Sequence, residues 1–167
     1  YGKTRIGAEW TRRSAGSGRF HRVNLIGATA DDARDIMIEG ESGILEVCPP
    51  WERPMYRPSK RRLDWPNGCY SLIFTADEPE RLRGKQHERF WADEIGAWKY
   101  PEAWDQAVLG LRIGPEPRAV VTSTPRPVRV IRELIAHPAC VVTHGSTYEN
   151  AENLAPIFLS TVVSKYE

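Results

Sequence analysis

Three short groups of residues carry side chains from which a phosphate-handling site could be built. They are Gly2-Lys3-Thr4 at the start of the chain, Asp93-Glu94 about ninety residues later, and Thr122-Ser123-Thr124. Glycine amides, a lysine and a hydroxyl bind phosphate oxygens and the Mg²⁺ that accompanies them. Carboxylates supply a metal ligand and a group that activates water. The three groups together predict a site that hydrolyses a nucleotide.

The first group matches only the end of the phosphate-loop pattern G-x-x-x-x-G-K-[ST]. The first glycine would lie upstream of Tyr1 and the chain does not begin with Met, so we interpret it as a fragment truncated within the loop. A turn followed by an exposed lysine is the alternative interpretation. Residues 5–10 favour the phosphate loop, because they predict a helix with Ile6 and Trp10 on one face. The N-terminus of such a helix binds phosphate.

The acidic pair follows the apolar run Phe90–Ala92, which predicts a buried strand. We expect Asp93 to bind Mg²⁺, directly or through a water, together with the hydroxyl of Thr4, and Glu94 to polarise the attacking water. Neighbouring side chains on a strand point to opposite sides, which suits two different tasks. Two solvated acids that open a turn are the alternative.

The remaining candidates have equally plain alternatives. Thr122, Ser123 and Thr124 could contact the γ-phosphate or the water, or could be the polar end of a strand before Pro125. Arg81 or Arg83 could stabilise the transferring phosphoryl group of its own or a neighbouring subunit, or could be a surface charge. A basic run could face DNA phosphates or solvent; it consists of Arg57, Lys60, Arg61 and Arg62.

Strand patterns alternate with helix patterns along the chain, which predicts one α/β domain with a mostly parallel sheet and helices on both faces. In such a sheet the ligand binds at the carboxyl ends of the strands. An irregular surface loop is expected over residues 48–59, and a hairpin turn at Asn67-Gly68. The expected strands are 22–27, 62–65, 69–74, 90–93, 118–122 and 140–143; the expected helices are 29–40, 102–111, 128–136 and one that begins near Pro156.

Composition argues against a strongly basic protein, a zinc or disulfide framework and a membrane-spanning helix. The chain has 167 residues, of which 41% are hydrophobic, and 23 basic residues nearly balance 22 acids, so no overall basic field is present. The three cysteines lack C-x-x-C spacing and the four histidines show no metal-ligand spacing, which disfavours a zinc or disulfide framework. No apolar run is long enough for a membrane helix.

In their order along the chain, seven segments resemble the large subunit of the terminases that package DNA into tailed-phage capsids, in particular the type found in prophages and gene-transfer agents. The segments are 2–10, 39–45, 65–68, 80–84, 91–94, 122–127 and 153–156. The resemblance implies a P-loop NTPase of the additional-strand catalytic-glutamate class. Its activity would be ATP hydrolysis with Mg²⁺, powering translocation of double-stranded viral DNA into a procapsid in the cytoplasm of an infected or lysogenic bacterium.

The resemblance also assigns roles. Gly2, Lys3 and Thr4 match the nucleotide-binding loop, with Thr4 and Asp93 on Mg²⁺, Glu94 as catalytic glutamate, and Thr122, Ser123 and Thr124 as the coupling motif. Arg83 matches an arginine finger that reaches an adjacent subunit. The implied partners are DNA, the portal protein, the terminase small subunit and further copies of the chain in a ring, without a membrane. A C-terminal nuclease domain of the family lies outside these residues.

Three hypotheses therefore remain open from the sequence. The first is the packaging-motor ATPase, and we expect the truncated chain itself to be weakly active or inactive. The second is a helicase-like DNA-dependent ATPase, which shares the loop and the acidic pair. The third is a non-catalytic nucleotide-binding or interaction module.

Overall fold

The sheet sets the architecture. The computed structural model describes residues 2–146, 149 and 152, and these contain six strands in the order β2-β3-β4-β1-β5-β6. Four strands run parallel and two add antiparallel at one side, so the expected mostly parallel sheet is confirmed. The parallel strands are β1 (Val23–Gly27), β4 (Tyr70–Thr75), β5 (Arg89–Asp93) and β6 (Arg118–Thr122); the antiparallel ones are β2 (Met55–Arg57) and β3 (Arg62–Asp64).

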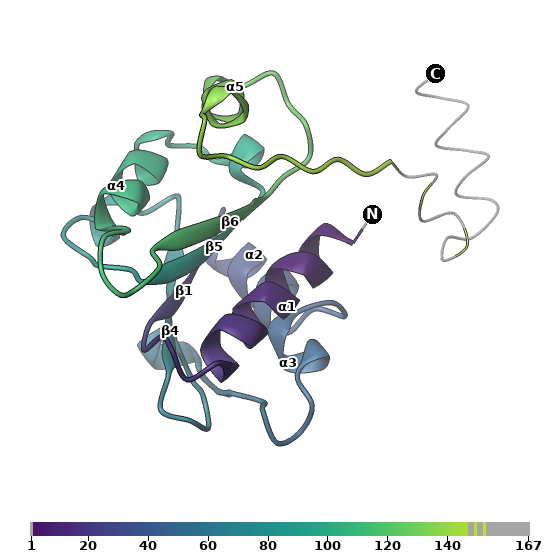
Figure 1. Cartoon of the computed structure of the whole chain (residues 1–167), viewed down its shortest axis with the longest axis vertical. Helices are drawn as coiled ribbons and strands as arrows, with labels where there is room; N and C mark the ends of the chain where they lie inside the picture. Colours follow the sequence, from purple (N-terminus) through teal and green to yellow (C-terminus); the bar gives the residue numbers. More distant parts are fainter. Residues whose placement is uncertain (1, 147–148, 150–151, 153–167) are drawn as a thin grey trace.

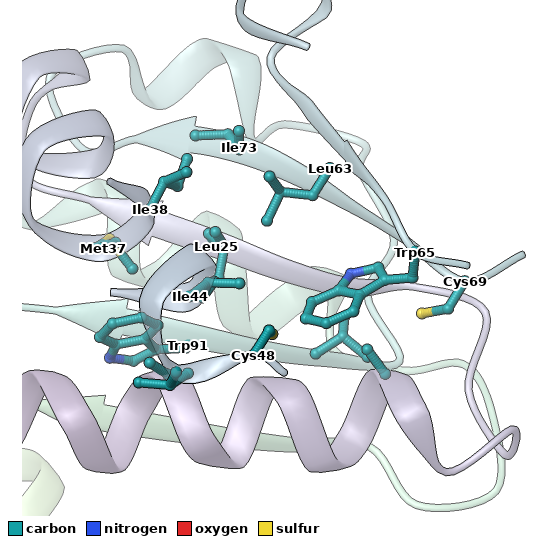
Figure 2. Close-up of a cluster of buried hydrophobic side chains, with 14 of the residues drawn as sticks. Leu25, Met37, Ile38, Ile44, Cys48, Leu63, Trp65, Cys69, Ile73 and Trp91 are labelled. Atoms are coloured by element: carbon teal, nitrogen blue, oxygen red, sulfur yellow. The ribbon is translucent and has the colours of Figure 1, made fainter. Parts of the chain in front are cut away.

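Helices cover both faces of the sheet, as the sequence predicts (Figure 1). On one face lie α1 (Lys3–Gly16), α3 (Ile44–Val47) and the π-helical segment η1 (Ala33–Ile38); on the other lie α4 (Glu102–Gly110) and α5 (Arg129–Ala136). Figure 2 shows the first of the two cores, in which Leu25, Ile73 and Trp91 of the sheet meet Met37 and Ile44. Four short helices complete the connections: α2 (Ala30–Asp32), η2 (Pro58–Lys60), η3 (Pro79–Arg81) and η4 (Ile95–Ala97).

Local sequence signals account for several element boundaries. The hydroxyl of Thr29 accepts a hydrogen bond from the backbone N–H of Asp32 at 3.2 Å and so caps α2. At the hairpin turn Gly68 has φ +90°, a conformation that side chains disfavour, and the backbone N–H of Trp65 donates to the carbonyl of Cys69 at 2.9 Å. The turn confirms the sequence-based expectation, and the cap lies at the start of the helix expected over residues 29–40.

Two expected segments are wrong. Residues 140–143 form no strand, and Val141 is 90% exposed. The segment leaves α5 and runs away from the sheet (Figure 1), so its backbone has no strand to pair with, and an apolar run alone does not make a strand. In the expected loop 48–59, residues 55–57 form β2, because Tyr56 pairs with Leu63 of the hairpin. The helix expected near Pro156 lies outside the described residues.

The buried faces of two helices also differ from expectation. Ile6 of α1 is 44% exposed, although the sequence predicted that it shares an apolar face with Trp10, and Val108 in the expected helix 102–111 is 43% exposed. The sheet-facing positions are instead small, namely Gly7, Ala8, Thr11, Ser14 and Ala15 in α1 and Ala103, Ala107 and Gly110 in α4. Small residues let these helices lie close to the sheet, where the large strand side chains fill the space.

Arg89 begins β5, where an aliphatic residue would be usual. Its guanidinium lies 4.0 Å from the centre of the Phe20 ring, donates to the hydroxyl of Ser14 at 3.0 Å and pairs with Glu116 at 2.9 Å. The charge is therefore paired and stacked at the amino-terminal edge of the sheet, which offsets part of the cost of burial. Burial still lowers the pKa of Arg89.

His87 is a buried titratable group in the second core. The ring is fully buried, touches Phe74 and Phe90 edge-on, and lies 2.7 Å through Nδ1 from the amide nitrogen of Asn24. Because the amide oxygen of Asn24 accepts from the backbone N–H of Leu72, the amide nitrogen is the donor and His87 Nδ1 the acceptor. Burial, with a smaller effect from the charge of Arg22, lowers the pKa of His87 to about 4.

We predict that replacing His87 with Gln reduces the loss of unfolding free energy that occurs as the pH is lowered. A histidine with pKa about 4 when folded and 6.5 when unfolded stabilises the fold above pH 6.5 and loses that contribution as the pH falls towards 4. From pH 7 to 4.5 the loss is about 2 kcal/mol of unfolding free energy, on top of the carboxylates. Denaturant unfolding at both pH values measures it. The exposed His21→Gln serves as control, and equal slopes for wild type and His87→Gln would contradict the prediction.

Candidate active site

The parallel register of β5 and β6 brings two of the three predicted groups together. Asp93 pairs with Thr122 across the two strands, at the carboxyl end of each. The pairing continues one step further, because the backbone N–H of Glu94 donates to the carbonyl of Thr122 at 2.7 Å. The acidic pair and the hydroxyl-rich segment therefore leave the sheet side by side.

Lys3 joins this edge from the start of α1. Its ammonium donates to Glu94 Oε1 at 2.9 Å and to the hydroxyl of Thr124 at 2.6 Å. The first turn of α1 also directs its unbonded backbone N–H groups to this end of the helix, since the first helical bond runs from Ile6 to Gly2. All three predicted groups thus meet at one site.

Glu94 has an unusual backbone. Its φ is +48°, one of two positive values at non-glycine residues in the described part of the chain. This left-handed conformation is costly for a residue with a side chain, and it turns the chain sharply from β5 into η4. Burial alone would raise the pKa of Glu94, but the Lys3 ammonium and the Thr124 donors outweigh it and hold the pKa below its usual value. Glu94 is therefore a carboxylate at neutral pH.

Asp93 lies deeper and has different partners. It is 5% exposed, and its Oδ1 accepts the Thr122 hydroxyl proton at 2.6 Å. Burial raises the pKa of Asp93, the Thr122 donor opposes that rise, and the nearby Glu94 charge adds to it. The adjacent acids thus occupy distinct environments, one fixed in the interior and one paired with an ammonium near the surface.

The oxygen donors at this edge suit Mg²⁺, which binds through one or two carboxylates together with substrate phosphates. Thr122 is the only side chain in the described part of the chain that donates to Asp93, and it does so at Oδ1. Among the described residues, no group of three or more His, Cys, Asp or Glu is arranged so that it could hold a metal ion. Thr4 is half-buried in the first turn of α1 and makes no hydrogen bond to Asp93 in the structure.

Comparison with known proteins decides the family. The family described as terminase large subunit, T4likevirus-type, N-terminal, matches residues 1–167. The chain belongs to this family. No curated protein sequence matches the terminase chain significantly.

Solved structures share the fold of this terminase chain. The large terminase of a thermophilic bacteriophage, in complex with ADP, has a TM-score of 0.73 at 13% identity, over 97% of this chain and 41% of that one. The ATPase domain of the Thermus phage P74-26 large terminase has a TM-score of 0.58 at 19% identity, over 80% and 59%. A mutant of the same Thermus phage domain gives 0.66 at 12% identity, over 95% and 81%. The chain spans about two fifths of the ADP-bound terminase.

Arg83 lies apart from the other predicted residues of the terminase site. It is exposed and lines a hollow of about 570 Å³ beside β4. In the sheet, β1 lies between β4 and β5, the strand that bears the acidic pair. Across the described residues no hydrogen bond or ion pair joins Arg83 to Lys3, Asp93 or Glu94. The other charged side chains of the hollow are Lys60, Arg61, Glu80, Arg81 and Lys85.

The basic run is mostly paired. Arg57 and Arg62 share Asp64 at 2.5 Å each, and Arg61 pairs with Glu78 at 2.5 Å. These contacts pair three of its four basic side chains with two carboxylates. They leave Lys60 beside Arg83 in the hollow.

Sequence reasoning missed three residues that support the acidic pair. The indole N–H of Trp91 donates to the Thr122 hydroxyl at 2.8 Å, and that of Trp98 to the backbone carbonyl of Asp93 at 2.9 Å. Gly7 lies directly against the Trp91 ring, where a Cβ would overlap its atoms. Both tryptophans lie in apolar stretches, which indicate core packing and no further role. Gly7 interrupts the apolar pattern of α1, so nothing in the sequence indicated its contact with Trp91.

We predict that Gly7→Ala destabilises the terminase domain by about 1–3 kcal/mol, since the added methyl group would force α1 or Trp91 to move. Gly16→Ala is the matched control at the end of the same helix, where a Cβ meets nothing within 4 Å. We expect this control to be neutral or slightly stabilising. Denaturant unfolding measures both variants, and equal effects would show that the close contact is not a constraint.

Proposed function

We propose that this domain hydrolyses ATP with Mg²⁺ to drive double-stranded viral DNA into a procapsid, as part of a terminase large subunit in the host cytoplasm. The observation that carries the proposal is the contact of Lys3 with Glu94 and Thr124 at the carboxyl ends of the sheet, in a chain of this family. The ADP complex of the similar large terminase supports nucleotide as the ligand.

In this proposal Lys3 exchanges its protein partners for phosphate. Its ion pair with Glu94 has side chains that are 32% and 30% exposed, so it contributes at most about 1 kcal/mol. Phosphate oxygens at the N-terminus of α1 can displace such a weak partner, because the helix amides add to the attraction. Gly2 and Thr4 would bind the nucleotide beside Lys3, with Thr4 also reaching the metal ion.

Release of Lys3 would prepare Glu94 for its task. Burial is the largest single influence on the Glu94 carboxylate and raises its pKa, while Lys3 and the Thr124 donors lower it. Loss of the ammonium would leave only the Thr124 donors against burial, so the pKa would rise and Glu94 would become a better proton acceptor. Glu94 would then orient and deprotonate the attacking water, while Asp93 and Thr4 would hold Mg²⁺. When bound, Mg²⁺ neutralises charge on the phosphate oxygens. Thr124 contacts both Lys3 and Glu94. These contacts support its proposed role of transmitting the loss of the γ-phosphate.

Gly2, Lys3 and Thr4 match the last part of the phosphate-loop pattern, and we propose that they act as that part of the loop. Portal protein, small subunit and neighbouring copies in a ring are the partners that this role requires.

Glu94→Gln tests the catalytic assignment in the full-length protein. We expect Mg²⁺-dependent ATP hydrolysis to fall by about 10²–10⁴-fold, because the amide cannot accept the water proton, while ATP binding persists. Lys3→Ala should instead lose ATP binding. Phosphate release and fluorescent-nucleotide titration separate the two. Undiminished hydrolysis by Glu94→Gln would refute its role, whereas ATP binding without hydrolysis by the wild-type protein would favour a non-catalytic module.

Arg83 is proposed to act on the nucleotide of a neighbouring subunit, because its own site lies two strands away. Arg83→Ala should lower portal-stimulated hydrolysis by about 10³-fold, the usual scale for such arginines. Arg81→Ala is the control, since Arg81 lines the same hollow but pairs with Glu78.

Mixing variants gives the sharper test. Arg83→Ala subunits have an intact site and Glu94→Gln subunits an intact arginine, so mixed rings should regain hydrolysis that neither variant has alone. Activity that remains no greater than the weighted sum of the two variants would contradict action between subunits.

A further inference from the structure

Two consecutive hydrogen bonds run beneath Asp93. The indole N–H of Trp91 donates to Thr122 Oγ1 at 2.8 Å, and the Thr122 hydroxyl donates to Asp93 Oδ1 at 2.6 Å. We propose that Trp91 is a positioning residue for the metal-binding carboxylate, acting through Thr122 to fix which oxygen of Asp93 faces the cation. This inference rests on the proposed function.

The chemistry of the three groups fixes the direction of both bonds. An indole nitrogen can only donate, so Thr122 Oγ1 must accept from Trp91. A hydroxyl has a single proton, and with one lone pair occupied by the indole, that proton is directed to Asp93. Without the indole, the hydroxyl could rotate towards another acceptor, and the carboxylate would lose its fixed partner.

Burial keeps water from replacing these bonds. Trp91 is fully buried, while Asp93 and Thr122 are 5% and 7% exposed. Hydrogen bonds between buried groups are stronger than exposed ones, and an unsatisfied buried donor is costly. The two hydrogen bonds therefore hold the Asp93 carboxylate in one orientation, because no water can replace either partner.

The same indole is held on its other side by α1. Gly7 lies against the Trp91 ring, one helical turn from Lys3. Figure 2 shows the Trp91 ring between the sheet and this helix. Trp91 thus connects the helix that bears the phosphate-binding lysine with the strand that bears the acids. This contact holds the lysine and the carboxylate in a fixed position relative to each other.

The test uses Mn²⁺ binding to the full-length protein with a non-hydrolysable ATP analogue, followed by electron paramagnetic resonance. Trp91→Phe keeps a ring but removes the N–H, and we expect Mn²⁺ affinity to fall about fivefold, equivalent to about 1 kcal/mol. Trp65→Phe is the matched control. Trp65 is also buried, and its N–H donates to the hydroxyl of Ser71 at 2.9 Å away from Asp93, so Mn²⁺ affinity should not change.

A double-mutant cycle distinguishes positioning from general destabilisation. Thr122→Val should weaken Mn²⁺ at least as much as Trp91→Phe, and Thr122→Ser should restore the affinity. In the Thr122→Val background, Trp91→Phe should add nothing, because it acts through the hydroxyl that is already gone. Thermal unfolding of each variant checks that the fold is retained.

Each outcome bears on one proposal. Equal Mn²⁺ affinities for Trp91→Phe and Trp65→Phe, or additive effects of Trp91→Phe and Thr122→Val, would overturn the positioning role of Trp91. Asp93→Asn supplies the separate check on the site itself. If Asp93→Asn leaves Mn²⁺ affinity unchanged, the proposed metal role of Asp93 fails; if it weakens binding while Trp91→Phe does not, only the positioning role fails.

Discussion

The parallel register of β5 against β6 is the constraint on which the site depends. Asp93 pairs with Thr122, so the last residues of β5 and β6 lie side by side. The segments that follow the two strands therefore leave the sheet next to each other. A shift by one residue would turn Asp93 to the opposite face of the sheet. Phe90, Trp91 and Ala92 are fully buried, with Trp91 in one core and Phe90 and Ala92 in the other, so a one-residue shift would exchange the two faces.

Close packing of α1 is the second constraint, because the helix brings Lys3 to that edge. A bulkier inner face would hold the helix away from the sheet and move the lysine ammonium with it. Gly7 and Ala8 allow contact with Trp91, and the size of the indole compensates for the missing side chains. The shortest side chains in the helix are thus matched to the largest one in the strand.

The two acids illustrate how one sheet edge supports a fixed group and a movable group. Asp93 is held through its side chain by Thr122 and through its carbonyl by Trp98, with little exposure to solvent. Glu94 leaves the strand in a left-handed conformation and pairs with Lys3 near the surface, where the interaction is weak and exchangeable. The first arrangement suits the metal ligand that we propose for Asp93, and the second suits the water-activating base that we propose for Glu94.

The sequence by itself determined which residues are chemically able to act and most strand positions, because apolar runs, the Asn67-Gly68 turn and the Thr29 cap are local signals. It could not reveal that 140–143 lacks a pairing partner, that Tyr56 joins the hairpin, or that small residues face the sheet in α1 and α4. Those outcomes depend on which surfaces meet. Only the tertiary structure decided that Lys3, Glu94 and Thr124 touch, that Arg83 stands apart beside β4, and that Trp91 supports Asp93. Such contacts join residues far apart in the chain, and their geometry follows from strand register and helix packing rather than from any local pattern.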